Sequence, residues 1–354
     1  MSRSTGLDAA RGIATLLVIV AHASIAYMVT PIGWAVQDAD RHLGFDVFVW
    51  LQSLFLMQLF FWLSGFVSRA KYERGAAGFV RSRAARLLLP FLVALVPCSL
   101  ALDALWDWGR ELAQRGVVPV NVPKLEGSSL PITLGHLWFL YYLLAASALA
   151  LVVVPLWHRL RLSSTVAYVV VLALIVVPLI DRRMLRPDVP LGFRLDPHVL
   201  SYYGGCFAWG WLAHGTRELE QHVRWTLPAL VASSLLLGAI APVAYASADP
   251  ANSAAIPIIA SVAAAVLMFA LVIAFVGLCL RLAHRRHRIV ELAADASYWA
   301  YIVHLPIVVL LQVVASTLDA PSLVEVIVIA TISFAVSIAT YAIAKRLRRR
   351  HVIK

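Results

Sequence analysis

The chain has 354 residues, of which 61% are hydrophobic and only 14% are charged. Soluble domains are about 45–50% apolar and about 25% charged, so the composition excludes a soluble globular enzyme and a disordered chain. The formal net charge of +11 would raise nucleic acid as a partner if the protein were soluble. The three cysteines all lie inside apolar runs, which excludes a disulfide-rich secreted scaffold and a zinc finger. The composition indicates an integral membrane protein.

A helix that spans a membrane needs about 20 predominantly apolar residues. Runs of this kind occur ten times and lack the alternation of barrel strands, so we expect an all-α polytopic integral membrane protein with about ten transmembrane helices. In chain order the expected spans are residues 12–29, 47–68, 87–102, 137–157, 162–180, 197–213, 225–248, 254–280, 297–316 and 326–344. The chain, 1–354, is expected to be a single transmembrane domain. Its longest outward loop, residues 107–131, could cap an external cleft.

Lys and Arg favour the cytoplasmic loops of membrane proteins. When alternate loops are assigned to the two sides, 21 of the 30 Lys and Arg residues fall on one side and eight on the other. This bias predicts that both termini are cytoplasmic, and it explains most of the net charge without nucleic acid. The sequence Ala21-His22-Ala23 resembles a signal-peptide cleavage site, but the apolar stretch continues to Val29. We therefore expect the segment to be retained.

Ionisable side chains inside the membrane are costly and usually line a cavity or a functional path. Arg11 and His22 are eleven residues apart on the first expected span, so they share one helical face about 16 Å apart along the axis. Asp8 is placed to pair with Arg11. A neutral imidazole at this depth can act as a general base. An interfacial arginine and a hydrogen-bonded packing histidine are the ordinary alternative.

A basic loop follows the second expected span. Arg83 and Arg86 are three residues apart in it, so on a helix they project from one face. Paired guanidinium groups suit phosphate, although ordinary cytoplasmic charge explains most such clusters. Ser64 and Gly65, at the end of that span, would permit a close helix approach.

Two further spans combine polar and aromatic residues. Trp138 follows His136 at the start of the fourth expected span, where an aromatic interface belt is the ordinary interpretation. Tyr301 and His304 share a face of the ninth expected span, and His304 lies two residues before Pro306. His304 is a second membrane histidine, for which a packing role is again the alternative.

In this order the motifs resemble the membrane acyltransferase family 3. The matching elements are Arg11 with His22, residues 60–66 (FFWLSGF), Arg83 and Arg86 with Pro90, and Tyr301 with His304 and Pro306. Residues 57–61 (MQLFF) and 135–140 (GHLWFL) look most like the periplasmic glucan O-succinyltransferase branch of that family. Gln58 stands where many other members have an acid, which argues against a mechanism that needs a carboxylate there.

The resemblance implies an O-acyltransferase of the bacterial inner membrane. It would move an acyl group from cytoplasmic acyl-CoA, either succinyl-CoA or acetyl-CoA, to a hydroxyl of a periplasmic or envelope glycan. No metal is expected. The implied alternative within the family is an acetyltransferase of lipopolysaccharide or another envelope acceptor. A secondary transporter and a structural scaffold also remain open, although a transporter usually has broken helices in repeated halves.

The resemblance also implies roles for single residues. His22 would be the general base, and Arg11 would either steer the donor or stabilise negative charge. Arg83 and Arg86 would bind the phosphates of the donor. The residues expected to line the substrate site are Ser64, Trp138, Tyr301 and His304.

Overall fold

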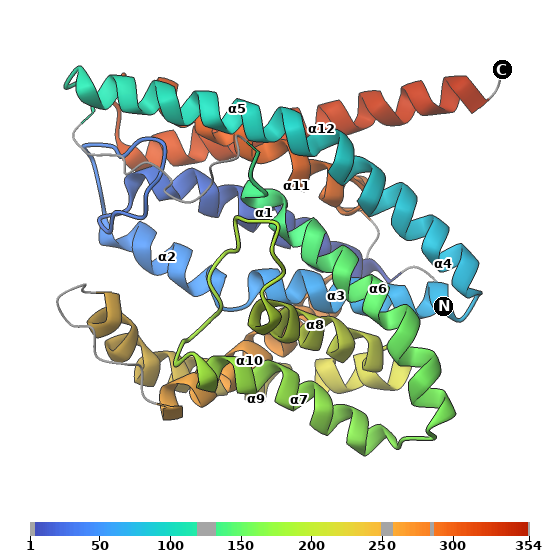
Figure 1. Ribbon diagram of the computed structural model, residues 1–354. Coiled ribbons are helices and arrows are strands. Elements are labelled where there is room, and N and C mark those ends of the chain that lie inside the picture. The colour runs from blue at the N-terminus through green and yellow to red at the C-terminus, as the bar shows by residue number, and fades with distance from the viewer. Residues whose placement is uncertain (1–3, 119–131, 249–257, 284–286, 353–354) are drawn as a thin grey trace.

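The structure, a computed structural model, describes residues 4–118, 132–248, 258–283 and 287–352. The described residues form helices and connecting loops without a strand, which confirms the all-α prediction. The helices are α1 (Thr5–Ser24), η1 (Ile25–Tyr27), α2 (Leu43–Ser53), α3 (Leu56–Tyr72), α4 (Ala76–Arg83), η2 (Ala84–Leu88), α5 (Leu89–Gln114), η3 (Gly135–Leu137), α6 (Trp138–Arg159), α7 (Ser164–Asp181), α8 (Pro197–Leu212), α9 (Thr216–Ala248), α10 (Ile258–Leu282), α11 (Arg288–Ala315) and α12 (Ser322–Val352). Figure 1 shows them as one bundle of long helices.

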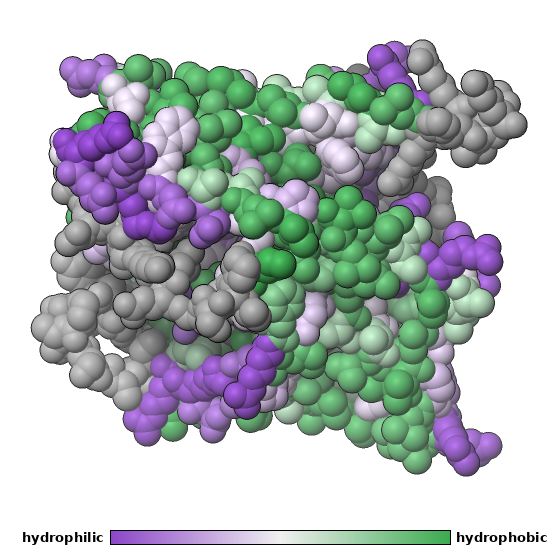
Figure 2. All heavy atoms as spheres, turned by 45° about the horizontal axis from the view of Figure 1, so that its top comes forward, coloured by the Kyte–Doolittle hydropathy of each residue, from purple (hydrophilic) through white to green (hydrophobic). Residues whose placement is uncertain are grey.

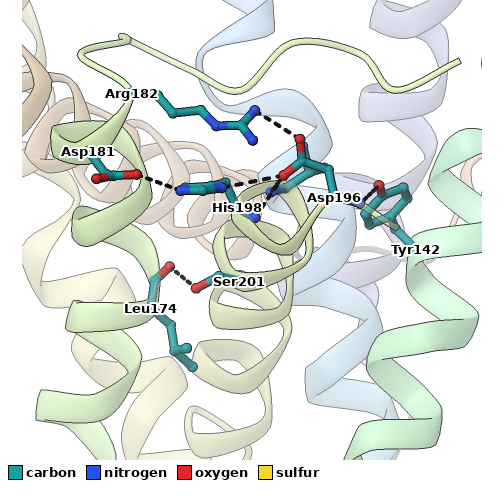
Figure 3. Close-up of polar contacts among 8 residues, drawn as sticks. Tyr142, Leu174, Asp181, Arg182, Asp196, His198 and Ser201 are labelled. Carbon is teal, nitrogen blue, oxygen red and sulfur yellow. Dashed lines mark hydrogen bonds and ion pairs between the residues drawn. The ribbon is translucent and has the colours of Figure 1, made fainter. Parts of the chain in front are cut away.

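Nine helical segments among the described residues are long and apolar enough to cross a membrane. They correspond to nine of the ten expected spans, and the tenth is α8, which has only 16 residues. At 1.5 Å per residue α8 is about 24 Å long. The first turn of α8 contacts the end of α7, where His198 Nε2 lies 2.6 Å from an oxygen of Asp181. One turn later in α8, Ser201 donates to the carbonyl of Leu174, which lies two turns before Asp181 in α7 (Figure 3). α8 therefore runs back across the bundle, antiparallel to α7, as a short interior helix.

Two of the expected spans are interrupted. The second consists of α2 and α3, which are separated by Leu54 and Phe55. The third, expected at residues 87–102, is part of a longer helical segment that begins with α4 and passes through η2, a π-helical segment, into α5. Because α5 continues to Gln114, the first part of the expected outer loop 107–131 is helical. Residues 119–131 lie outside the described residues, so the capping role of that loop stays a prediction.

The outside of the bundle is apolar. Figure 2 shows a broad hydrophobic belt with hydrophilic residues gathered at opposite sides of it. Large aliphatic side chains in the middle of outer helices are exposed, among them Val93 on α5, Val169 on α7 and Leu235 on α9. A surface of this composition suits hydrocarbon rather than water. The chain is a multi-pass membrane protein.

The centre of the bundle is formed around α1, the most buried of the candidate spans among the described residues. α1 packs against α10, α11 and α12, while α3 packs against α8. At that second contact a Cβ on Gly65 would lie 1.9 Å from the carbonyl oxygen of Phe207, and one on Gly210 would lie 1.9 Å from that of Trp62. The close helix approach expected at Gly65 is therefore confirmed, and each helix contributes a glycine to it.

The start of α1 and the end of α12 lie at the same end of the bundle, to the right in Figure 1 together with α4. Thr5 donates to the carbonyl of Ala283 there, and Lys345 pairs with Asp295 at 3.3 Å. We call this the basic end, because it holds the segment from Arg69 to Arg86, which was expected as a loop but is helical except between α3 and α4. The loop 28–42 lies at the opposite end. That the basic end faces the cytoplasm remains a prediction from the charge bias.

Candidate active site

A pocket opens between α1, α3, α4 and α11 toward the basic end. Four cationic side chains line it, namely Arg11, Lys71, Arg83 and Arg86, and none of its described lining residues is acidic. Arg11 has a carboxylate in reach, since Asp8 lies 3.9 Å away on the preceding turn. Four positive charges without a carboxylate among the lining residues make this pocket a candidate site for an anion.

Arg83 is the most deeply held of these cations. Only 8% of the residue is exposed. Its guanidinium donates to the hydroxyl of Ser68 at 2.8 Å and to that of Ser64 at 3.3 Å, and it lies over the ring of Phe79. All three partners are uncharged, so they orient the guanidinium without neutralising it. Arg86, by contrast, is exposed and lies within the π-helical segment η2, a feature that is frequent at functional sites.

Three histidines from different elements meet deeper in the bundle. His22 comes from α1, His136 from η3 and His304 from α11. The ring centroids of His22 and His304 are 5.0 Å apart, and those of His136 and His304 are 5.5 Å apart. His304 is fully buried, His136 is 6% exposed and His22 is half-buried. The structure thus brings together two histidines singled out in the sequence and adds a third.

Backbone carbonyls assign the tautomers of the two central rings. Nδ1 of His304 lies 2.8 Å from the carbonyl oxygen of Tyr301, and Nδ1 of His22 lies 2.9 Å from that of Val18. A carbonyl only accepts, so both Nδ1 atoms carry hydrogen and both Nε2 atoms keep a lone pair when the rings are neutral. His304 Nε2 lies 3.3 Å from His22 Nδ1, so its lone pair faces that N–H group. The lone pair with which His22 could accept a proton is therefore on Nε2.

His136 was not among the predicted site residues. Its Nε2 donates to the carbonyl of Ile302 at 2.9 Å, which leaves the lone pair on Nδ1. That Nδ1 is buried and has no hydrogen-bond partner in the described part of the chain. A buried acceptor without a partner costs about 1–3 kcal/mol, so a substrate hydroxyl would relieve it. The signal in the sequence was a third histidine at the start of a span, which the neighbouring aromatic residues led us to interpret as an interface belt.

Tyr301 connects the pocket to the histidines. Its side chain lines the pocket beside Phe139, while its hydroxyl donates to the backbone carbonyl of His136. The Tyr301 ring centroid lies 5.7 Å from that of His136 and 5.7 Å from that of His304. The cationic pocket and the histidine cluster are therefore adjacent parts of one site.

The remaining predicted site residues fall into two groups. Ser64 and Tyr301, expected to line the substrate site, both line the pocket that holds the cations. Trp138 is 4% exposed and packs on Tyr203 and Tyr142, away from the pocket lining. Within the described residues, no group of three His, Cys, Asp or Glu side chains could hold a metal ion.

One of three comparisons with known proteins found a match. A family profile described as an acyltransferase domain, that of acyltransferase family 3, matches residues 4–342. Neither the curated proteins nor the solved structures gave a match. The profile spans every helix that contributes to the pocket and to the histidine cluster. Residues 4–342 are nearly the whole chain, and the protein therefore belongs to acyltransferase family 3 and is a membrane acyltransferase.

Proposed function

We propose that the protein transfers an acyl group from cytoplasmic acyl-CoA to a hydroxyl of a periplasmic or envelope glycan. The observation behind this proposal is the adjacency of the carboxylate-free cationic pocket and the histidine cluster, which share Tyr301. The pocket supplies the charge that an anionic donor needs, and the cluster supplies a base. The donor, the acceptor and the orientation in the membrane are all part of the proposal.

The donor binds in the pocket through its phosphate groups. Coenzyme A has several phosphate charges at one end and the thioester at the end of a flexible arm. Arg83 and Arg86 bind the phosphates, because guanidinium groups offer paired donors to phosphate oxygens. The arm then extends past Tyr298 and Ser297 toward Tyr301 and Phe139, which also line the pocket. Arg11 lies on this path, where it can steer the arm or stabilise negative charge.

The transfer uses His22. Its Nε2 removes the proton from the acceptor hydroxyl as the hydroxyl oxygen attacks the carbonyl carbon of the thioester. The tetrahedral intermediate collapses, the carbon–sulfur bond breaks, and the coenzyme A thiolate takes the proton from the His22 imidazolium. An ester and free coenzyme A result. The Nδ1–H group of His22 stays shared between the carbonyl of Val18 and Nε2 of His304 throughout.

The site explains how a cytoplasmic donor can modify an external acceptor, because only the acyl group has to move toward the opposite end. The acyl group is proposed to be succinyl, on the resemblance of residues 57–61 and 135–140 to the glucan O-succinyltransferase branch. An acetyl group on lipopolysaccharide or another envelope acceptor is the alternative. A succinyl carboxylate would find cationic partners in the pocket.

The test combines labelled donors with analysis of the products. Membranes with equal amounts of wild type or His22→Ala receive radiolabelled succinyl-CoA or acetyl-CoA, and the envelope glycans and lipids are examined by mass spectrometry. Wild type should add one acyl mass, and His22→Ala should lose about 10²–10⁴-fold in rate. His158→Ala, an exposed histidine at the end of α6, is the matched control and should keep wild-type activity. Substantial transfer by folded His22→Ala would overturn the role of the base, and no label from either donor would overturn acyl-CoA as the donor.

A further inference from the structure

Gln312 occupies a central place beside the histidine cluster. It lies on α11 two turns beyond His304 and is fully buried. Its Nε2 donates to the carbonyls of His22 and Ala23, at 2.9 and 3.0 Å, and its Oε1 accepts from the indole N–H of Trp34 at 2.8 Å. Every hydrogen of the amide nitrogen is therefore used, and one side chain joins the end of α1 to the loop 28–42.

This arrangement holds the Trp34 ring against His22. The two ring centroids are 6.1 Å apart and the planes are inclined by only 27°. His304 contacts the same imidazole with its ring centroid at 5.0 Å. His22 therefore has two aromatic neighbours, one from α11 and one from the loop 28–42.

The loop that holds Trp34 is itself fixed. The carboxylate of Asp46 accepts from the backbone N–H groups of Val29 and Thr30, at 2.8 and 2.9 Å. Ala35 lies so close to α5 that a Cβ on Gly109 would be 1.9 Å from its carbonyl oxygen. Trp106, also on α5, contacts Trp34 edge to face with 5.2 Å between the centroids. The indole is thus held from several sides without any substrate.

We propose that Trp34 and Gln312 are positioning residues that hold the His22 imidazole in its reactive orientation. The proposal rests on the proposed function, in which Nε2 of His22 must point at the acceptor hydroxyl. A ring that turns freely about its side-chain torsions would spend little time in that direction. Trp34 restricts the ring by contact, and Gln312 fixes both Trp34 and the backbone from which His22 projects.

The first measurement does not depend on acyl transfer. Full-length protein in detergent is treated with diethyl pyrocarbonate, which modifies accessible neutral imidazoles, and the modification rate at His22 is followed by peptide mass spectrometry. Trp34→Ala and Gln312→Met should each raise the rate at His22 severalfold, since the first removes a neighbour of the ring and the second releases Trp34 and the backbone of His22. Trp34→Phe keeps a ring in this place but loses the hydrogen bond to Gln312, so its rate should lie between those of wild type and Trp34→Ala. Trp108→Ala, which removes an exposed indole from α5, is the matched control and should not change the rate.

The second measurement is the kinetics of acyl transfer. Trp34→Ala and Gln312→Met should lower kcat by about 10- to 100-fold, because a small misplacement of a reacting group has effects of this size. The KM for the donor should stay unchanged, since neither residue lines the cationic pocket. Trp34→Phe should recover part of the loss in kcat, since it keeps the ring but not the hydrogen bond to Gln312. A general folding defect would not produce this combination of a kcat effect, an unchanged donor KM and rescue by the conservative variant.

A third variant acts from a distance. Gly109→Ala should push the loop 28–42 away from α5 and so reproduce the effects of Trp34→Ala. Gly44 is a helical glycine with open space around it, so Gly44→Ala is the control and should have no such effect. The proposal is wrong if Trp34→Ala and Gln312→Met leave both the modification rate and kcat at wild-type values. If the modification rates change as expected while wild type transfers no acyl group, the positioning of His22 is supported and the proposed function fails.

Discussion

Nε2 of His304 lies 3.3 Å from Nδ1 of His22, across the contact between α11 and α1. When the Nε2 atom of His22 takes a proton, the positive charge spreads to the Nδ1–H group, which faces the lone pair of His304. In hydrolytic triads a carboxylate fills this place. A neutral imidazole stabilises the cation less but leaves no charge in the apolar centre of the bundle when the site is at rest.

This relationship predicts the behaviour of His304 variants. His304→Ala should lower kcat by about 10- to 100-fold, because a hydrogen bond to a charged group contributes about 1.5–3 kcal/mol. The donor KM should not change. His304→Gln should keep part of the activity, since its amide oxygen can accept from His22. Steady-state kinetics on reconstituted protein measure both constants, and an effect confined to donor KM would contradict the assignment.

Arg83 and Arg86 should determine donor affinity. The double variant Arg83→Ala with Arg86→Ala should raise the donor KM at least 10-fold, because two charge-assisted contacts to phosphate are lost. The value of kcat at saturating donor should change little. Arg74→Ala removes an exposed arginine that does not line the pocket and is the matched control. Binding of coenzyme A alone, measured by calorimetry, should weaken in parallel, and unchanged binding would refute the donor site.

Much of the fold follows from the sequence, because hydrophobic length is what a bilayer requires of a helix. Nine of the ten expected spans correspond to described helical segments that are long and apolar enough to cross a membrane, and the tenth, residues 197–213, forms the shorter helix α8. The break between α2 and α3 was not predictable, since Leu54 and Phe55 are as apolar as their neighbours. The folding of residues 107–114 into α5 was likewise hidden by the charged side chains in that stretch.

The site was predictable where a polar residue stands out against an apolar span. His22 and His304 met that condition, and the structure places them in contact. Trp34 and Gln312 did not, because an indole near a membrane interface and an amide near a helix end are ordinary features. Their pairing joins positions 278 residues apart and exists only in the folded chain.

The contact between α3 and α8 makes a prediction about stability. Gly210→Ala should destabilise the protein, because the added Cβ would lie 1.9 Å from the Trp62 carbonyl and the two helices would have to separate. Gly204→Ala, in the same helix with nothing within 4 Å of the new Cβ, is the matched control and should be neutral or slightly stabilising. Thermal unfolding in detergent, followed by tryptophan fluorescence, gives both midpoints. Equal midpoints would mean that the helices can part without loss.

Asp196 makes a prediction about pH. It lies outside the spans at the start of α8, where Figure 3 shows it joined to both Arg182 and His198. Partial burial opposes ionisation of this carboxyl, but the backbone N–H of His198 and the guanidinium of Arg182, 2.8 Å away, together hold its pKa below the usual value. A carboxyl with a lowered folded-state pKa stabilises the fold above its unfolded pKa of about 3.9 and loses this effect as the pH falls through the folded value.

The variants Asp196→Asn and Asp196→Ala separate the charge from the helix cap. Asn keeps the cap that Asp196 forms with the N–H groups of His198 and Val199, so at pH 7 it should lose only the pairing with Arg182, about 1 kcal/mol or less. Ala should lose about 0.5–2 kcal/mol more. The gap between wild type and Asp196→Asn should begin to narrow below about pH 4 and close as the pH falls through the lower folded-state pKa, where the wild-type carboxyl becomes neutral. The test is the unfolding midpoint of each variant from pH 3 to 8, with Asp188→Asn, at an exposed position, as the control. A difference between the midpoints of wild type and Asp196→Asn that does not depend on pH would show that the ion pair does not stabilise the start of α8.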